Sequence, residues 1–275
     1  MRHQKSRLLP LALLVGPWFA SAAIAAPPSA EEAGSSMDAA TEAHAPAQWR
    51  LSLTPYLWIP AQNGTVGRGP VRASVDLDIG ETFDTIRDNF NFGGALHAEL
   101  SRDRVTLFAD AMYLSLESDD NPSQPGATDV RSDQGIFEVG GAYALVFKPR
   151  DADGPGFVFQ PLAGLRIQTL HLDIDTEAGP EFSGSQTWVD GFIGAAASVE
   201  FSDRLAFRVR GDIGVGESDF TWNALAGIGF AVCPKAVLQF GYRALDTEYD
   251  DGRGADKFDY DMILHGPYMA LRIVF

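Results

Sequence analysis

Two features are missing from this sequence. It has one cysteine, Cys233, so no disulfide can form within the chain. After residue 25 it also lacks any run close to the roughly 20 consecutive apolar residues that a membrane-spanning helix needs. Inside a bilayer every backbone polar group has to be hydrogen-bonded, and besides helices only closed barrels of strands achieve this. If the chain crosses a membrane, it therefore crosses with strands.

Basic residues are scarce as well. The chain has 21 Lys and Arg against 37 Asp and Glu, a net charge of −16. Three of the basic residues lie within residues 1–25, so the chain without that segment has 18 basic and 37 acidic residues, or −19. Proteins that bind nucleic acid by neutralising its phosphates need the opposite sign. The composition thus excludes nucleic acid as a partner of this kind.

The N-terminal residues have the three parts of a secretory signal peptide. Residues 2–7 include three basic side chains, residues 8–19 are mainly apolar, and residues 23–25 read Ala-Ile-Ala, a small-x-small cleavage site. We expect Sec-type export with cleavage near Ala25. Because Cys233 does not lie at this site, attachment of a lipid to the cysteine is not expected.

The next segment, residues 26–47, consists largely of Ala, Pro, Ser, Glu and Thr. A segment with so few large apolar groups cannot bury enough surface to offset the entropy lost on ordering. We therefore predict a disordered periplasmic segment at 26–47. Residues 48–275 are left as a single domain.

Within that domain, apolar and polar residues alternate, as in strands that have one face in lipid and the other in a polar lumen. The predicted strands are 49–59, 90–100, 105–116, 135–147, 157–173, 186–201, 205–215, 220–232, 237–245 and 258–275. Short turns between them alternate with long loops. The pattern predicts an all-β fold, a transmembrane antiparallel up-and-down β-barrel of about ten strands, with eight or twelve as alternatives.

Three places depart from simple alternation. Residues 60–89 are predicted to be an extracellular excursion over or into the barrel mouth, with a short extra hairpin as the alternative. The alternation slips near Thr169. In the last strand, residues 258–264 have the opposite phase from 269–275, so a β-bulge is predicted at Gly266-Pro267, with Phe258, Tyr260, Met262 and Leu264 facing outward.

The last strand, 268–275, alternates and ends on an aromatic residue, Phe275. It resembles the closing strand of Gram-negative outer-membrane β-barrels. Together with the signal peptide and the tight turns at 101–104 (SRDR) and 201–204 (FSDR), it makes the domain similar to the small outer-membrane barrels of the OmpA/OmpW-like superfamily.

This resemblance implies a monomer in the cell outer membrane, in contact with outer-membrane lipids and lipopolysaccharide. It also implies that Phe275 is part of the signal read by the barrel-assembly machinery, and that periplasmic chaperones escort the chain. The resemblance specifies a fold and hardly a function, because such barrels include adhesins, channels and enzymes.

Charged residues occupy inward positions of the predicted strands. Six are arginines and six are carboxylates: Arg50, Arg166, Arg208, Arg210, Arg243 and Arg272, with Glu99, Asp110, Glu138, Asp190, Glu200 and Asp212. Charges buried in a narrow barrel have to be paired. The equal numbers favour a mutually neutralising network with a structural role. A narrow channel for small polar solutes, lined by the same charges, is the alternative, since many inward positions are Gly or Ala.

Histidines offer the chain's candidates for enzymatic chemistry. His171 lies near Asp173 and Asp175, and His265 lies near Asp261 and Asp259, all at the predicted outer rim. A rim hydrolase, omptin-like or lipid-modifying, is therefore an alternative function, although no omptin motif is matched. His97, beside Glu99, is interpreted as a lumen histidine satisfied by its neighbours. Solvated acidic loops account for the acidic residues of 246–261, and we expect no metal site and no cofactor.

Overall fold

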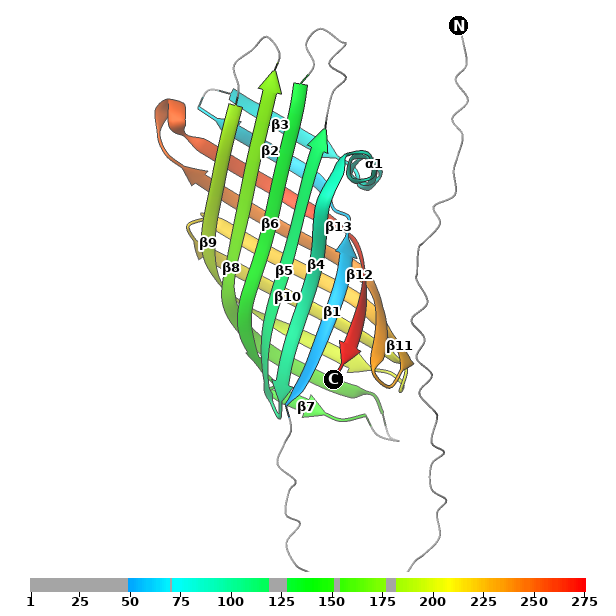
Figure 1. The fold of residues 1–275 in the computed structure, drawn as a ribbon. Helices are drawn as coiled ribbons and strands as arrows, with labels where there is room; N and C mark the ends of the chain where they lie inside the picture. Colours follow the sequence, from blue (N-terminus) through cyan, green and yellow to red (C-terminus); the bar gives the residue numbers. More distant parts are fainter. Residues whose placement is uncertain (1–48, 70, 119–127, 151–153, 177–181) are drawn as a thin grey trace, which may run out of the picture. The chain divides into compact units, whose positions relative to one another are not determined.

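The computed structural model describes residues 49–69, 71–118, 128–150, 154–176 and 182–275 (Figure 1). The predicted signal peptide and the predicted segment 26–47 lie outside these residues, as do parts of the predicted loops. The described residues belong to one compact unit.

The described strands close into an antiparallel barrel (Figure 1). In order around its wall, they are β1 (Arg50–Trp58), β4 (Phe90–Arg102), β5 (Val105–Ser118), β6 (Thr128–Tyr143), β8 (Gly156–Thr176), β9 (Phe182–Glu200), β10 (Leu205–Gly216), β11 (Phe220–Cys233), β12 (Ala236–Asp251) and β13 (Phe258–Val274). The last strand pairs with the first, with Leu53 opposite Ile273, and this pairing closes the ring. The predicted all-β, antiparallel ten-stranded barrel is confirmed.

Several strands extend further than their apolar alternation. β6 begins at Thr128 and ends at Tyr143, whereas 135–147 was predicted. The residues after it form a separate short strand, β7 (Val146–Lys148), which pairs with β8 alone. β8 and β9 also continue beyond their predicted loop-side ends, as a paired ladder that runs to Ile174 and Phe182. Polar residues on both faces of these extensions hid them from a pattern based on apolar alternation.

Residues 60–89 form both a hairpin and a helix. β2 (Ala61–Arg68) pairs with the first half of β13, and β3 (Val71–Leu77) pairs with β2. Helix α1 (Ile79–Asn89) then leads into β4. The hairpin alternative is confirmed for residues 61–77, and the rest of the segment forms a helix instead of a second hairpin. No helix in the described part of the chain is long and apolar enough to cross a membrane.

The predicted bulge at Gly266-Pro267 is wrong. β12 and β13 stay in one register from Ala236 opposite Ile273 to Asp251 opposite Phe258. Because the strand keeps its phase, Tyr260, Met262 and Leu264 face the lumen and are buried. The prediction failed because it took every apolar face for a lipid-facing one, whereas the lumen at this height is itself apolar.

The predicted slip near Thr169 is absent too. Around Thr169, β8 pairs without a register shift both with β6 and with β9. Irregularities do occur between Phe90 and Phe92 of β4 and between Ala231 and Cys233 of β11. Both lie at strand ends, where bulges are common.

The lumen is filled in layers. One apolar cluster contains Phe108, Leu162, Phe192 and Ala196, a second contains Trp58, Ile136, Leu245 and Leu264, and a third contains Trp188, Tyr249, Tyr260 and Met262. The third also packs against Val66 and Val75 of the β2–β3 hairpin. A short 3-10 helix, η1 (Gly254–Asp256), joins β12 to β13. Side chains, rather than open space, therefore occupy the inside of the barrel at these heights.

The junction between β1 and β2 depends on a glycine. An added Cβ at Gly266 would lie against the carbonyl oxygen of Ile59 and 2.8 Å from the Cα of Pro60, both backbone atoms. The Trp58 indole also donates to the Gly266 carbonyl oxygen at 3.3 Å. We expect Gly266→Ala to lower the free energy of unfolding by about 1–3 kcal/mol, because the backbone has to shift.

The measurement is denaturant unfolding of the refolded protein in detergent micelles, followed by tryptophan fluorescence. Gly94→Ala is the matched control, because a Cβ there would meet no atom within 4 Å. Equal midpoints for the two variants would contradict the proposed role of Gly266.

Candidate functional site

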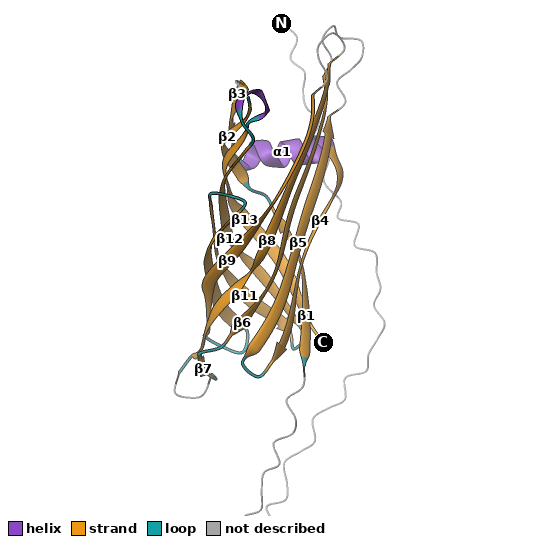
Figure 2. Cartoon of the chain, turned by 90° about the vertical axis from the view of Figure 1, so that its left-hand side faces the viewer, coloured by secondary structure: helices purple, strands orange, loops and turns teal. Residues whose placement is uncertain are grey.

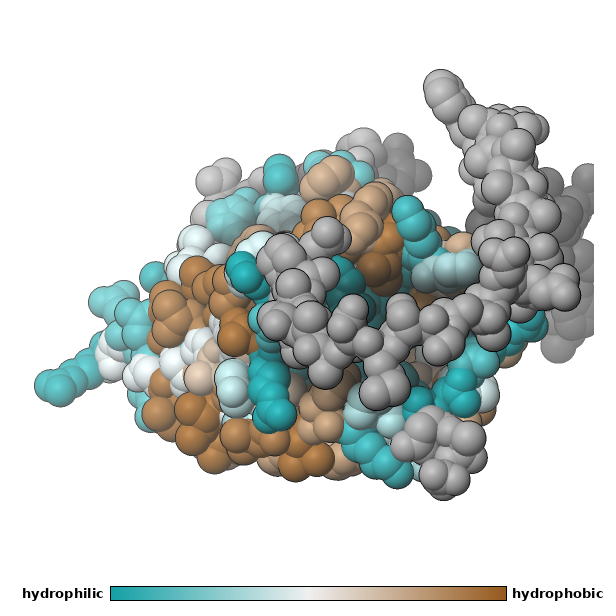
Figure 3. Space-filling model, turned by 90° about the horizontal axis from the view of Figure 1, so that it is seen from below, coloured by the Kyte–Doolittle hydropathy of each residue, from teal (hydrophilic) through white to brown (hydrophobic). Residues whose placement is uncertain are grey.

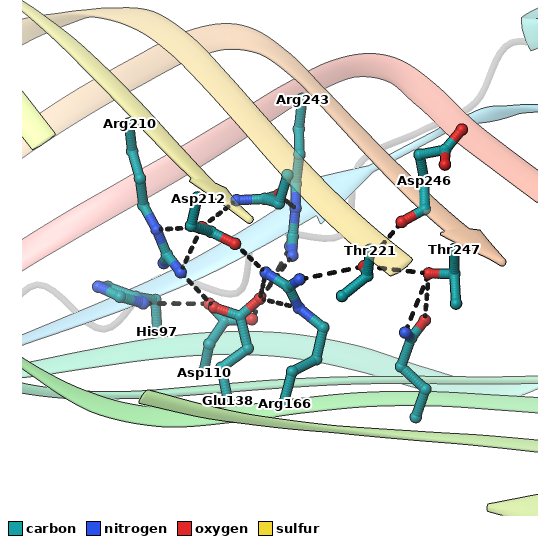
Figure 4. Close-up of polar contacts among 12 residues, drawn as sticks. His97, Asp110, Glu138, Arg166, Arg210, Asp212, Thr221, Arg243, Asp246 and Thr247 are labelled. Atoms are coloured by element: carbon teal, nitrogen blue, oxygen red, sulfur yellow. Dashed lines mark hydrogen bonds and ion pairs between the residues drawn. The ribbon is translucent and has the colours of Figure 1, made fainter. Parts of the chain in front are cut away.

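A cluster of buried charges in the lumen is centred on Glu138 of β6 (Figure 4). Its Oε1 accepts hydrogen bonds from Arg166 Nε at 2.9 Å and from Arg243 Nη2 at 3.3 Å. Its Oε2 accepts from Arg210 Nη2 at 2.7 Å. The three arginines come from β8, β12 and β10, so one carboxylate connects four strands across the lumen.

Asp212 of β10 completes the cluster. Its Oδ1 accepts from Arg166 Nη2 at 2.6 Å, and its Oδ2 accepts from Arg210 Nε and Asn223 Nδ2, both at 3.0 Å. The side chains of Arg166 and Asp212 are both 0% exposed. Taking an isolated ion out of water costs several kcal/mol, so these charges are tolerated only as a mutually paired set.

A second cluster surrounds Glu99 of β4. This carboxylate accepts from Arg208 at 2.8 Å and from Arg272 at 2.9 Å. One ring nitrogen of His97 lies 3.4 Å from Glu99, and the other lies 3.1 Å from Asp110. Asp110 also accepts from the Tyr56 hydroxyl at 2.8 Å. As predicted for a satisfied lumen histidine, His97 lies between two polar neighbours, and it links the two carboxylates.

Aromatic rings lie next to the guanidinium groups of three of these arginines. The guanidinium carbons of Arg166 and Arg210 lie 5.0 Å and 5.4 Å from the centre of the Phe192 ring. Arg210 also lies 5.1 Å from the centre of the Phe108 ring, and Arg243 lies 4.9 Å from that of Trp58. A cation over an aromatic face is attracted electrostatically, and more strongly when water is excluded. Sequence reasoning missed Phe108 and Phe192, although their strand phase already placed them inside.

The structure brings together nine of the twelve predicted lumen charges. The other three are placed differently. Arg50 and Glu200 are exposed at strand ends. Asp190 is fully buried, but its Oδ1 accepts from the Ser218 backbone N–H at 2.9 Å, and its Oδ2 has no hydrogen-bond partner among the described residues. Asn223 and Thr221 also take part in the cluster, although neither residue was predicted from the sequence to do so.

On the side of the charges towards β2, β3 and α1, the lumen stays filled. Arg166 Nη1 donates to Thr221 Oγ1 at 3.3 Å, and Gln168 Nε2 donates to Thr247 Oγ1 at 3.0 Å (Figure 4). Further along, Trp188 stacks on Tyr249 with ring centres 4.7 Å apart. A cavity beside Gln168 and Trp188 measures about 10 Å³, near the least that holds one water molecule.

The rim histidines have different neighbours. His171 Nε2 lies 2.7 Å from Asp173 Oδ2, as the sequence suggested, while the side chain of Asp175 lies outside the described residues. His265 pairs with the Tyr242 hydroxyl at 2.6 Å and with Asn63 at 3.0 Å, not with Asp259 or Asp261. In the described residues, no group of His, Cys, Asp and Glu is arranged to hold a metal ion.

Acidic residues line the ends of β10–β13 on the same side. Lys257 reaches Asp259 at 2.6 Å and Asp250 at 3.4 Å, and Arg72 reaches Asp259 at 3.0 Å. A hydrogen bond to Asp250, together with the charge of that carboxylate, raises the pKa of Asp219 in the turn between β10 and β11.

No family model matches the chain, and no curated protein matches it. Solved structures do. The outer membrane protease OmpT from Escherichia coli is 9% identical, with 82% of this chain and 97% of that chain covered, at a TM-score of 0.47. Neisserial surface protein A is 13% identical, with 82% and 97% covered, at a TM-score of 0.30.

An outer membrane channel from Pseudomonas putida F1 is 10% identical, with 86% of this chain and 100% of that chain covered, at a TM-score of 0.34. These similar structures include a protease and a channel. At such low identity, neither activity transfers to this chain.

The Glu138 cluster leads to a test by a nearly isosteric substitution. Glu138→Gln removes the charge that faces three arginines and leaves those cations under-compensated in a dry environment. We expect a loss of about 3–5 kcal/mol in the free energy of unfolding. Denaturant unfolding in micelles measures it. Glu200→Gln, at an exposed position, is the matched control and should change stability by less than about 0.5 kcal/mol.

The Asp219–Asp250 contact predicts a pH effect at the rim. Because the pKa of Asp219 is raised in the folded chain, the folded state binds a proton more tightly than the unfolded state. The stability that protonated Asp219 contributes is therefore present at low pH and is lost as the pH rises through the pKa of Asp219 in the folded chain. Carbon-13 NMR titration of the side-chain carboxyl should place Asp219 above ordinary aspartates. Asp250→Asn should change that pKa, and an unchanged titration would contradict the assignment.

Proposed function

We propose that this chain is an outer-membrane β-barrel with a closed lumen and a structural role. Support for the membrane comes from the outer wall. Each of the ten barrel strands exposes a large apolar side chain: Leu57, Leu96, Leu107, Val139, Leu165, Ile193, Ile213, Ile228, Phe240 and Met269. Water-soluble proteins rarely expose a contiguous apolar patch of more than a few hundred Å², and this one surrounds the barrel. Brown apolar residues occupy much of the outside in the view from below (Figure 3).

Polar residues limit this apolar band at both ends. Towards the extracellular side, register places Ser115, Asp133, His171 and Ser185 side by side on four neighbouring strands. At the other end, the strand ends and turns contain basic residues: Arg102, Arg104, Lys148, Arg150, Arg204 and Lys235. A band of apolar residues with polar limits is what a bilayer-spanning barrel requires. Outer-membrane lipids and lipopolysaccharide are then its surroundings, and the barrel-assembly machinery and periplasmic chaperones its partners during biogenesis.

The closed lumen supports a structural role over a channel. Arg166, Thr221 and Asp190 point into the lumen and have no exposed surface, so bulk water does not reach these three side chains. The buried layer involves residues from several parts of the ring, from Asp110 on β5 to Arg243 on β12. A continuous pathway for small polar solutes would require this cluster to come apart. That full burial is the observation on which the proposed role depends.

Planar-bilayer recording tests the role. The purified protein should produce no steady conductance across voltages while keeping the heat-modifiable gel mobility of a folded barrel. A stable pore altered by Arg208→Ala or Arg210→Ala would overturn the structural role in favour of the narrow channel. Peptide or lipid hydrolysis abolished by His171→Ala would overturn it in favour of a rim hydrolase based on the His171–Asp173 pair.

A further inference from the structure

The barrel wall loses part of its strand pairing on one side. β1 and β4 are paired from Arg50 opposite Ser101 to Pro55 opposite Leu96. Beyond that point β1 remains on β13 as far as Trp58, and β4 remains on β5 as far as Phe90. In the described part of the chain, no ladder joins these two upper strand segments. Another element has to cover the wall there.

Helix α1 is that element. It contacts β2 and β3 on one side and β4 and β5 on the other, and Figure 2 shows it running across between these strands. Asp78 and Glu81 form a capping box, with Asp78 Oδ1 accepting from the Glu81 N–H at 2.8 Å and Glu81 Oε2 from the Asp78 N–H at 3.0 Å. A helix hydrogen-bonds its own backbone, so it tolerates a place beside lipid that an open strand edge does not.

The register of the wall gives the height of α1. The helix ends at Asn89, and Phe92 follows it on β4 with 65% of its surface exposed. Phe92 lies opposite Ser115, and Ser115 lies opposite Asp133. Ser115 and Asp133 have the outward phase of the wall at the upper limit of the apolar band defined above, and both are buried beneath other side chains. The helix therefore lies at the edge of the band, where headgroups meet acyl chains in a barrel of this orientation.

The side chains of α1 divide into three faces. Thr82 is buried at 2%, and Thr85, Ile86 and Asn89 are partly buried against the barrel. Arg87 forms exposed ion pairs with Asp84 and Asp88, both at 2.8 Å. Ile79 and Phe83, one helical turn apart, lie next to the covered face and remain 37% and 45% exposed. The barrel thus leaves an apolar strip on this helix uncovered.

We propose that α1 is an interfacial helix, and that Ile79 and Phe83 insert into the outer leaflet at the boundary between lipid headgroups and acyl chains. The occupant is lipid because the strip continues the lipid-facing band, whose Leu57, Phe92 and Leu96 are exposed at the top of β1 and β4. An amphipathic helix with apolar residues on one side and charges on the other lies in this plane of a bilayer. The inference rests on the proposed membrane location and assigns a specific lipid contact to it.

Site-directed spin labelling tests the contact in the full mature chain. The single cysteine is first removed by Cys233→Ser, and Phe83→Cys then carries a nitroxide in vesicles of phosphatidylcholine and phosphatidylglycerol. Power-saturation EPR compares collisions with oxygen, which concentrates in lipid, and with a water-soluble nickel chelate. We expect the oxygen-to-nickel ratio at position 83 to exceed, several-fold, that at position 88 (Asp88→Cys), which lies about 140° away around the helix at 100° per residue.

Two other results would overturn the proposal. A label at position 83 as accessible to nickel as one at position 88 would place the strip in water. A label at position 83 that is immobilised and shielded from both reagents would place it against protein, either the barrel mouth or a second copy of the chain. Leu107→Cys, an exposed position within the band on β5, separates the two levels of inference: if it too collides mainly with nickel, the membrane location itself fails.

Discussion

Burial of charge inside a narrow lumen is the constraint on which this barrel depends. Glu138 and Asp212 share Arg166 and Arg210, and Arg243 joins them through Glu138. Side chains alternate between the two faces of a strand, so a shift of one residue in any of these strands would send its arginine or carboxylate to the outer face of the barrel, which faces lipid in the proposed membrane location. An arginine at the middle of the bilayer face costs about 2–4 kcal/mol. The cluster therefore specifies the register of its strands as well as filling the space between them.

Much of the architecture could be predicted from the sequence because a barrel strand repeats one simple rule. Alternation with period two placed Glu99, Glu138, Arg166 and Asp212 inside without knowledge of any neighbouring strand. The same rule failed at Tyr260, Met262 and Leu264, because it treats an apolar face as lipid-facing. The lumen beyond the charge cluster contains stacked aromatic and aliphatic side chains, and nothing in one strand distinguishes such a lining from a lipid-facing surface.

The inward or outward phase of a residue also does not give its height along the barrel axis. Arg50 and Glu200 have inward phase, yet both lie at strand ends where solvent reaches them, and Asp190 lies nearer to a backbone N–H than to any arginine. Height depends on how neighbouring strands are staggered, which is a property of the closed sheet. For the same reason the sequence predicted an excursion or a short hairpin for residues 60–89 but not which strands the β2–β3 hairpin and α1 contact. β13 extends beyond the end of β1, and β2 pairs with the part of β13 that β1 does not reach. This pairing fixes the position of the hairpin and of the helix that follows it.

The pairing of β1 with β13 has a further consequence for how the barrel is made. Ser52 lies opposite Val274, and Arg272 reaches Glu99 across 173 positions of sequence. Contacts between such distant residues have to overcome the entropy of closing a very long loop, and topologies dominated by them fold slowly. Until the final strand arrives, both ends of the curved sheet are open and Glu99 lacks one of its two arginines. We therefore expect the ring to close late, when the last strand supplies hydrogen bonds to two neighbours and a counter-charge to the interior.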